Sequence, residues 1–424
     1  MKKKNKSANK NHRAEQVKST NIGKKKPIAL VIPWYGDDIR GGAEMECNYL
    51  AHSLTAVGQP VEVFTTCVRE ACDDRGKNTI KPGTYVESGI TVRRFLVREN
   101  RDLDHYDDSN YRLYHNLNFT LEDEEIYFRE DINSDEMCSF IRENKDNYRA
   151  FMFIPYLYGV TYNASFCCEE KSIMIPCLHD ESYAYMRLLK DKMNSFQGLV
   201  FLAKPEQDLA VKLYGLENVK QAVLGGGLDT DWHTSCNAEA FRKKFKIRDP
   251  FILFAGRKDA GKKADELIKF FLRYKRETGD EKLKLVLIGG GELPVEVPAK
   301  YREEVIDLGF VSVEDKHNAF AACTILCNPS YFESFSLVIM EGWLAKRPVL
   351  VSEHCAVTTN FAQETNGGLW YKDYPEFKGC INYLLEHPQV CDVMGANGQR
   401  YVLDHFTHEK IAENYLAFVD ACGL

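Results

Sequence analysis

Two carboxylates eight residues apart, Glu333 and Glu341, are the residues of this chain whose type and spacing most clearly suggest chemistry. Glu333 follows an apolar run at 324–327 and a turn at 328–332, so we expect it just past the carboxyl end of a buried strand, where open α/β sheets place ligands. The residues after it would begin a helix whose free N–H groups can hold a phosphate. Glu341, about two turns further on, would reach a second polar group of the same ligand. The spacing suggests sugar-nucleotide chemistry.

Two basic residues, Arg257 and Lys262, follow another apolar run at 250–255. A guanidinium can clamp a diphosphate with two parallel hydrogen bonds, and an ammonium adds a compact charge. Taken alone, this segment is most simply a solvated basic loop. Because it belongs to the same predicted sheet as Glu333 and Glu341, the favoured interpretation is that Arg257 and Lys262 stabilise a diphosphate.

Polar residues also follow strands in the first half of the chain. His179 comes after the apolar run at 173–178, and we expect it to face the cleft and contact a sugar hydroxyl; a histidine satisfied by a nearby carbonyl is the competing interpretation. Asp229 and Asp231 have the spacing of a metal-binding pair, but a turn between domains is favoured. The fourteen cysteines lack the paired spacing of a zinc site. The sequence therefore predicts neither a metal nor a cofactor.

The chain is long enough for two domains, since 424 residues exceed one ordinary core. Strand and helix patterns alternate in both halves, which predicts doubly wound parallel sheets; their arrangement as two facing Rossmann-like domains is what the family resemblance described below implies. The expected first domain spans 27–235, the second spans 236–405, and a helix in 406–424 crosses back to the first. Helices of the second domain are predicted at 264–277, 314–322, 336–346 and 374–386. No Gly-x-Gly-x-x-Gly fingerprint follows a strand, which counts against a nicotinamide-dependent dehydrogenase.

Charge is unevenly spread along the sequence. Residues 1–26 hold ten lysines and arginines against one acid, Glu15, and almost no large apolar side chains, which predicts a disordered basic tail. The net charge of −7 and the pI near 6.0 argue against nucleic-acid binding. No secretory signal or membrane span is indicated, so we expect a cytoplasmic protein. Attraction of the tail to the inner face of the membrane stays open.

The order and spacing of several short motifs resemble glycosyltransferase family 4, a group of retaining transferases with two Rossmann-like domains, the GT-B architecture. The motifs are Gly41-Gly-Ala-Glu44, His179-Asp180, Gly227-Leu-Asp229, Gly256-Arg257 with Lys262, Leu308-Gly-Phe-Val311, and Glu333-x7-Glu341 followed by Arg347-Pro-Val349. Segments 64–69, 153–158 and 366–371 look like a branch associated with bacterial surface polysaccharides. The resemblance covers nearly everything after the tail.

The resemblance implies a role for each matching residue. Arg257 and Lys262 would bind the donor diphosphate, Glu333 the transferred sugar and Glu341 the ribose. Backbone groups of Phe335, Ser336 and Leu337 would meet the phosphate and sugar, Phe310 and Val311 would lie near the base, and Gly41 and Gly42 would line the cleft. The chain departs from the family pattern at Ser336, Gly342, Lys263 and the pair Gly225-Gly226.

The predicted activity is that of a retaining hexosyltransferase that moves sugar from a nucleoside-diphosphate (NDP) sugar to a glycan or lipid-linked glycan without a metal. Two alternatives remain. A sugar-nucleotide epimerase or hydrolase of the same architecture would convert the donor without an acceptor, and a silent scaffold subunit would bind it without turnover. The base, the sugar, the acceptor and the oligomeric state stay open at this stage.

Overall fold

A computed structural model of the chain describes residues 25–36, 39, 41–70 and 74–424. Residues 1–24 of the predicted basic tail lie outside the described residues. Among the helices of the described ranges, none combines the length and the apolar composition that a membrane span requires.

The first half of the chain folds around an eight-stranded sheet with the order β3-β4-β2-β1-β5-β6-β7-β8. The strands are β1 (Ile28–Val31), β2 (Val61–Thr66), β3 (Gly83–Glu87), β4 (Ile90–Phe95), β5 (Ala150–Phe153), β6 (Ser172–Met174), β7 (Gly198–Phe201) and β8 (Lys220–Val223). β1, β2 and β5 are apolar and almost entirely buried, as strands covered on both faces should be.

One strand of this sheet corrects the prediction of a purely parallel sheet. β3 pairs antiparallel with β4 at the sheet edge. The two strands join at Ser88 and Gly89, which both have positive φ, as a tight hairpin turn requires. The sequence did not reveal β3 because both of its faces are largely exposed, which leaves no apolar alternation to detect.

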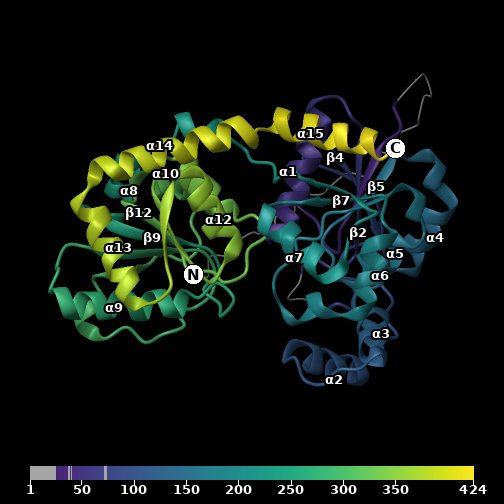
Figure 1. Cartoon of the computed structure of the whole chain (residues 1–424), viewed down its shortest axis with the longest axis horizontal. Helices are drawn as coiled ribbons and strands as arrows, with labels where there is room; N and C mark the ends of the chain where they lie inside the picture. Colours follow the sequence, from purple (N-terminus) through teal and green to yellow (C-terminus); the bar gives the residue numbers. More distant parts are fainter. Residues whose placement is uncertain (1–24, 37–38, 40, 71–73) are drawn as a thin grey trace, which may run out of the picture.

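Helices α1 (Gly42–Ala56), α5 (Gly159–Ser165), α6 (Arg187–Ser195) and α7 (Lys204–Tyr214) belong to the body of this half. Three further helices, α2 (Leu103–Tyr114), α3 (Leu121–Glu130) and α4 (Asp135–Asn144), lie between β4 and β5, and none was predicted. α2 and α3 project beyond the body of the domain (Figure 1). α3 begins with a capping box, in which Thr120 and Asp123 exchange hydrogen bonds. We call residues 101–144 the helical excursion.

The second half folds around a six-stranded, fully parallel sheet with the order β11-β10-β9-β12-β13-β14. Its strands are β9 (Phe251–Ala255), β10 (Lys284–Ile288), β11 (Val305–Asp307), β12 (Ile325–Asn328), β13 (Val349–Ser352) and β14 (Gly368–Tyr371). Its helices are α8 (Ala238–Phe245), α9 (Ala264–Thr278), α10 (Val313–Ala322), α11 (Leu337–Leu344), α12 (Ala356–Thr365), α13 (Tyr374–Glu386) and α14 (Pro388–His405). The four predicted helices are present within two residues at each end. Short β14, which opens with a glycine, was not predicted.

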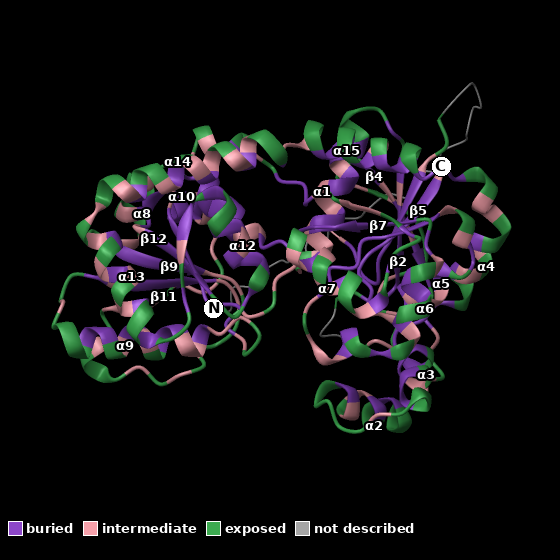
Figure 2. Cartoon of the chain, in the orientation of Figure 1, coloured by how far each residue is buried: buried purple, intermediate pink, exposed green. Residues whose placement is uncertain are grey.

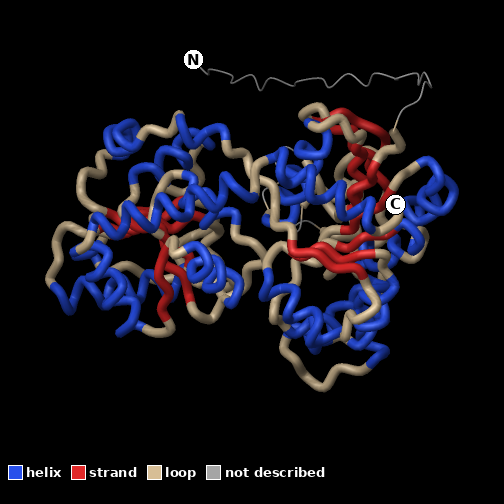
Figure 3. Tube along the Cα trace, turned by 45° about the horizontal axis from the view of Figure 1, so that its top comes forward, coloured by secondary structure: helices blue, strands red, loops and turns tan. Residues whose placement is uncertain are grey.

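The last helix, α15 (His408–Ala421), crosses back to the first half, as expected. In Figure 1 it continues from α14 and reaches α1. His408 Nδ1 lies 2.7 Å from Ser53 Oγ of α1, and the Tyr415 hydroxyl donates to the Gly225 carbonyl at 3.1 Å. The two sheets remain separate (Figure 3), each within its own buried layer (Figure 2). The predicted division at 235/236 falls between β8 and β9.

Candidate functional site

Lys262 and Glu333, predicted from separate motifs, form an ion pair. Lys262 Nζ lies 2.8 Å from Glu333 Oε1, with about a third of the lysine side chain exposed. Asn328, at the end of β12, also donates to Glu333 Oε1 at 3.3 Å. The Lys262 amide donates to Asp259 Oδ1 at 3.0 Å, which fixes the loop after β9. The loops after β9 and β12, neighbours in the sheet, thus place a cation and a carboxylate together at its carboxyl edge.

The segment after Glu333 forms a turn before it becomes helical. Ser336 precedes α11 and adopts a left-handed conformation with φ of 69°, and Asn328 Nδ2 donates to its hydroxyl at 2.8 Å. The amides of Ile339 and Met340 donate to the Ser336 carbonyl, at 3.1 Å and 3.4 Å. The N–H groups before them at the start of α11 have no acceptor within the helix, and the binding of an anion there stays a prediction. The Phe335 side chain packs on Phe361 and Phe406 in the core, so only its backbone can contact a ligand.

Glu341 is held by a cation that the sequence analysis missed. Lys316 of α10 lies 2.5 Å from Glu341 Oε1, and the glutamate side chain is 8% exposed. Among the described residues, the second oxygen of this carboxylate accepts no hydrogen bond, so it can accept one from a ligand hydroxyl. Lys316 gave no signal because it stands in a polar helical stretch with no motif around it.

Arg257 does not join the pair of Lys262 and Glu333. Its side chain is 71% exposed and its Nε lies 3.2 Å from Asp259 Oδ2. It is nevertheless near the first domain, because its charge acts on Glu44 of α1. Burial raises the pKa of Glu44, whereas hydrogen bonds from its own amide and from the Trp34 indole, together with Arg257, oppose that rise.

Glu44 lies against one of the two glycines of the first loop. A Cβ at Gly41 would overlap the Glu44 carboxylate, which therefore folds back over the start of α1. A Cβ at Gly42 would meet nothing. A side chain at Gly41 would thus displace the Glu44 carboxylate, while Gly42 leaves open space at the N-terminus of α1.

A second missed lysine, Lys258, ties together three loops of the second sheet. Its side chain is fully buried, and Nζ lies 2.6 Å from the Gly289 carbonyl and 3.1 Å from Asp307 Oδ1. Asp307 Oδ1 also accepts from the Gly309 amide at 3.0 Å. Next to this loop, Phe310 is 74% exposed and lies against Gly290, where a Cβ would come within 2.7 Å of its ring. Val311, by contrast, packs against the core.

The first domain faces this site through the loop after β6. The rings of His179 and Phe332 lie 6.1 Å apart, although one belongs to each domain. His179 Nδ1 is 3.6 Å from Glu181 Oε1. His179 therefore lies beside the loop that carries Glu333, and its contact with a sugar hydroxyl stays a prediction.

Asp229 and Asp231 form a turn: Asp229 Oδ1 accepts from the Asp231 amide at 3.1 Å. Within the described part of the chain, no group of three or more histidine, cysteine or carboxylate side chains is arranged to hold a metal ion. Independence from metal stays a prediction.

Three departures from the family pattern have physical reasons. A Cβ at Gly342 would overlap the end of the Leu326 side chain. Gly225 has φ of 74°, and Phe406 fills the place of its Cβ, while Glu46 does so at Gly226. Lys263 adopts a left-handed conformation where glycine is frequent, and its ammonium lies 4.4 Å from the centre of the Tyr331 ring.

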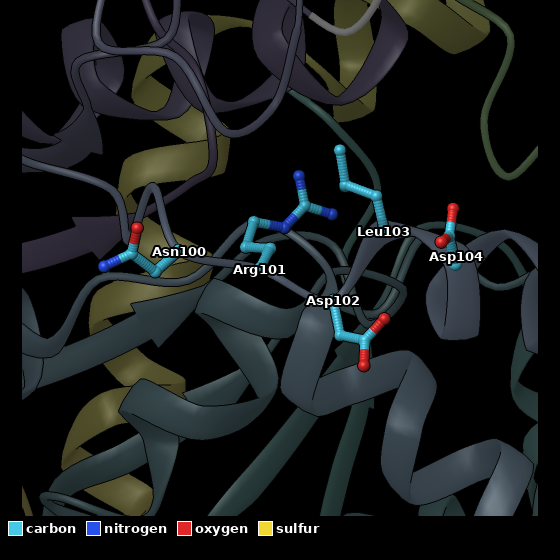
Figure 4. Close-up of a pocket in the computed structure, with 5 residues that line it drawn as sticks. All are labelled: Asn100, Arg101, Asp102, Leu103 and Asp104. Carbon is cyan, nitrogen blue, oxygen red and sulfur yellow. The ribbon is translucent and has the colours of Figure 1, made fainter.

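A surface hollow lies away from this constellation. Its lining residues, Asn100, Arg101, Asp102, Leu103 and Asp104, are consecutive and open the helical excursion (Figure 4). None of the predicted site residues is among them, so the hollow does not define the site.

Comparison with known proteins supports a glycosyltransferase. Residues 237–401 match the family described as glycosyl transferases group 1. The N-acetylgalactosamine-N,N'-diacetylbacillosaminyl-diphospho-undecaprenol 4-alpha-N-acetylgalactosaminyltransferase of Campylobacter jejuni is 34% identical over 113 residues, 26% of this chain and 29% of that protein. The chain spans less than half the length of the first curated relatives it matches.

Two solved structures resemble the whole chain. Sucrose-phosphate synthase from Thermosynechococcus elongatus has a TM-score of 0.65 at 15% identity and covers 94% of this chain and 99% of its own. Anabaena HepE in complex with UDP-glucose also has a TM-score of 0.65, at 14% identity, covering 93% and 99%. The chain therefore has the two-domain GT-B fold, and its second domain matches the group 1 glycosyl transferases.

Proposed function

We propose that the protein is a retaining glycosyltransferase that moves a hexose from an NDP-sugar to a glycan or lipid-linked glycan held by the first domain. The observation that carries this proposal is the ion pair of Lys262 and Glu333 at the carboxyl edge of the second sheet, opposite His179. It places a cation for phosphate beside a carboxylate for sugar hydroxyls, next to the unsatisfied N–H groups that precede α11.

The donor would lie along the loops of the second domain. Lys262 and the exposed Arg257 would bind its diphosphate, with Gly42 leaving room on the opposite side. Glu341, fixed by Lys316, would accept from the ribose. Phe310, exposed and supported on Gly290, would pack against the base.

Catalysis would rest on charge and position. As the bond from the sugar to the diphosphate breaks, Lys262 and Arg257 stabilise the departing negative charge. The acceptor hydroxyl attacks from the same face, a phosphate oxygen of the donor takes its proton, and Glu333 and His179 orient the sugar. Closure of the two domains would exclude water, which otherwise competes as acceptor.

The comparisons are consistent with a sugar-nucleotide donor and a glycan acceptor, but they do not identify either substrate. One structural neighbour is described in complex with UDP-glucose, and one relative is named as a transferase acting on a diphospho-undecaprenol-linked sugar. We propose the same classes here: a nucleoside-diphosphate donor and a glycan of the surface-polysaccharide type. Contact with the inner face of a membrane, through the basic tail, belongs to this proposal too.

The test is nucleoside diphosphate release from UDP-, GDP- and ADP-sugars, with and without EDTA. Glu333→Gln and Lys262→Met should each reduce turnover at least ~100-fold while changing stability by at most about 1 kcal/mol, because the pair is partly exposed. Lys378→Met is the matched control, since Lys378 pairs with Glu277 at 2.9 Å with a similar exposure, 34%. Near-normal turnover in either site variant contradicts the assignment, and loss of turnover with EDTA contradicts independence from metal.

A further inference from the structure

Three exposed tyrosines, Tyr111, Tyr114 and Tyr185, lie on the first domain beside the loop of His179. Resting on the proposed function, we infer that these side chains, here called the tyrosine ledge, bind the acceptor, and that the part of the acceptor they bind is an uncharged saccharide chain of more than one sugar. Nothing in the donor site requires this surface, because the donor residues belong to the second domain, to the start of α1 and to His179 itself.

The exposure of the tyrosine ledge is unusual for side chains of this size. Tyr111 is 57% exposed, Tyr114 66% and Tyr185 48%. Tyr111 and Tyr114 are three residues apart on α2 and so share one face. His115 contacts both, with ring centres 4.1 Å and 4.9 Å away. Within the described ranges, neither tyrosine hydroxyl hydrogen-bonds to protein. Apolar patches of this kind mark binding surfaces.

The tyrosine ledge is fixed to the candidate site. Tyr183, on the 3-10 turn Ser182–Tyr185, donates to Asn110 Oδ1 of α2 at 2.6 Å. Ser182 Oγ donates to the Tyr114 carbonyl at 3.2 Å. This turn begins three residues after His179, which faces Phe332 of the second domain. The ledge therefore continues the surface at which the transferred sugar would lie.

Tyr185 connects the ring surface to a carboxylate. Its hydroxyl donates to Asp180 Oδ1 at 2.6 Å, and Asp180 is the residue after His179. The C–H face of a pyranose packs on an aromatic ring, and its hydroxyls donate to carboxylates. Rings with a neighbouring carboxylate thus suit a saccharide, and tyrosines supply such contact at low entropic cost.

The charge of the helical excursion limits which chemical class of acceptor can bind there. Residues 101–130 hold nine aspartates and glutamates against three arginines. Three of these acids are buried and each is paired with an arginine, which leaves six exposed: Asp102, Asp104, Asp107, Asp108, Glu122 and Glu125. Arg112 is already paired with Asp108 at 2.7 Å and also with Asp123. Such a surface repels phosphorylated sugars and anionic lipids. An uncharged saccharide meets no such penalty.

The position of the ledge on two elements indicates that the acceptor contains more than one sugar. A single sugar at His179 would leave Tyr111 and Tyr114 uncovered, because the turn Ser182–Tyr185 connects the His179 loop to α2 and lies between them. Only an acceptor with further sugars would reach them. Replacing these tyrosines should therefore affect long acceptors and spare short ones.

The experiment compares Tyr111→Ala/Tyr114→Ala with wild type, using neutral mono- and tetrasaccharides of glucose, galactose and N-acetylglucosamine as acceptors. The KM for the preferred tetrasaccharide should rise about tenfold, with kcat, donor KM and monosaccharide transfer unchanged. Tyr383→Ala is the matched control, because Tyr383 is 43% exposed and stacks on His387 with ring centres 4.4 Å apart, but lies in the second domain. It should leave every constant unchanged.

An unchanged KM of the double variant for the tetrasaccharide overturns the inference, as does a preference of the wild-type protein for a phosphorylated saccharide. The inference is also overturned if the double variant loses binding to phosphatidylglycerol vesicles but keeps its binding to the saccharide. Direct titration with the tetrasaccharide, without donor, separates this from the proposed function. If the saccharide binds only when the tyrosine ledge is intact and no donor is turned over, the binding role of the ledge is supported and the proposed transferase activity is refuted. If the donor is turned over but the ledge binds no saccharide, the transferase activity is supported and the role of the ledge is refuted.

Discussion

A buried carboxylate at the junction of the two domains should make the stability of this protein depend on pH. Glu46 of α1 is 2% exposed and packs against the connection between the domains. Its Oε1 accepts from the Gly227 amide at 3.3 Å, but its Oε2 is buried without a hydrogen-bond partner. Burial, with a smaller contribution from the charge of Glu206, raises the pKa of Glu46 from 4.5 to about 8.

The direction of this pH dependence follows from the coupling of folding to proton binding. Below pH 4.5 Glu46 is protonated in both the folded and the unfolded protein, so it does not lower the free energy of unfolding. Between pH 4.5 and 8 the unfolded chain ionises while the folded protein keeps the proton, and stability falls by about 1.4 kcal/mol per pH unit. At pH 7 the accumulated cost is about 3 kcal/mol. Above pH 8 the folded protein ionises too, and the cost stops growing.

Glu46→Gln removes this cost. The Gln oxygen can still accept from Gly227, and its NH₂ takes the place of the unpaired Oε2. We expect the variant to match wild type near pH 4.5 and to be more stable by about 3 kcal/mol at pH 7. For a domain of about 200 residues this corresponds to a Tm higher by roughly 6 to 12 °C. Urea unfolding from pH 5 to 8.5 measures the difference.

The matched control is Glu206→Gln, because Glu206 is equally buried and its pKa is raised to about 7. Both of its oxygens accept backbone amides, from Leu178 at 2.7 Å and Leu202 at 2.6 Å. A glutamine there must turn an NH₂ against an amide, and this loss offsets the gain from removing the ionisation cost, so Glu206→Gln should stabilise the protein less than Glu46→Gln does at every pH and should destabilise it near pH 4.5. Stability of Glu46→Gln that runs parallel to wild type across the pH range would refute the reasoning.

Two further predictions concern packing at the donor site. Lys258→Met should lower stability by about 2 kcal/mol, because Asp307 and the Gly289 carbonyl lose their buried partner. It should also raise the donor KM more than it lowers kcat, since the Phe310 loop loses its support; urea unfolding and steady-state kinetics measure both, and wild-type values for both contradict the account. Gly342→Ala should cost about 1 kcal/mol, because the new Cβ displaces the end of Leu326. Combined with Leu326→Val, it should cost less than the sum of the two single changes; strict additivity in that double-mutant cycle would show that the contact is not the cause.

Much of the fold could be predicted from the sequence, because the buried strands are continuous apolar runs. β1, β5 and β9 are such runs, and parallel strands covered on both faces give no other pattern. β3, exposed on both faces, and the helical excursion gave no comparable signal. The excursion is held by polar contacts between its helices and the Tyr183 turn, and these depend on the three-dimensional fold.

Which residues stand at the carboxyl ends of strands follows from the order of residues along the chain: Lys262, Glu333 and His179 follow apolar runs, and a strand must end where its loop begins. Which of the neighbouring cations turns inward depends instead on the folded protein. Arg257 and Lys258 are adjacent in the chain, yet the first is 71% exposed and the second is fully buried. Successive side chains near a strand end point to opposite sides, so adjacent positions meet different loops, and the loops they meet come from distant parts of the chain. Lys316 at Glu341, Glu46 at the domain connection and the tyrosine ledge have the same origin, because each exists only where separate elements pack together.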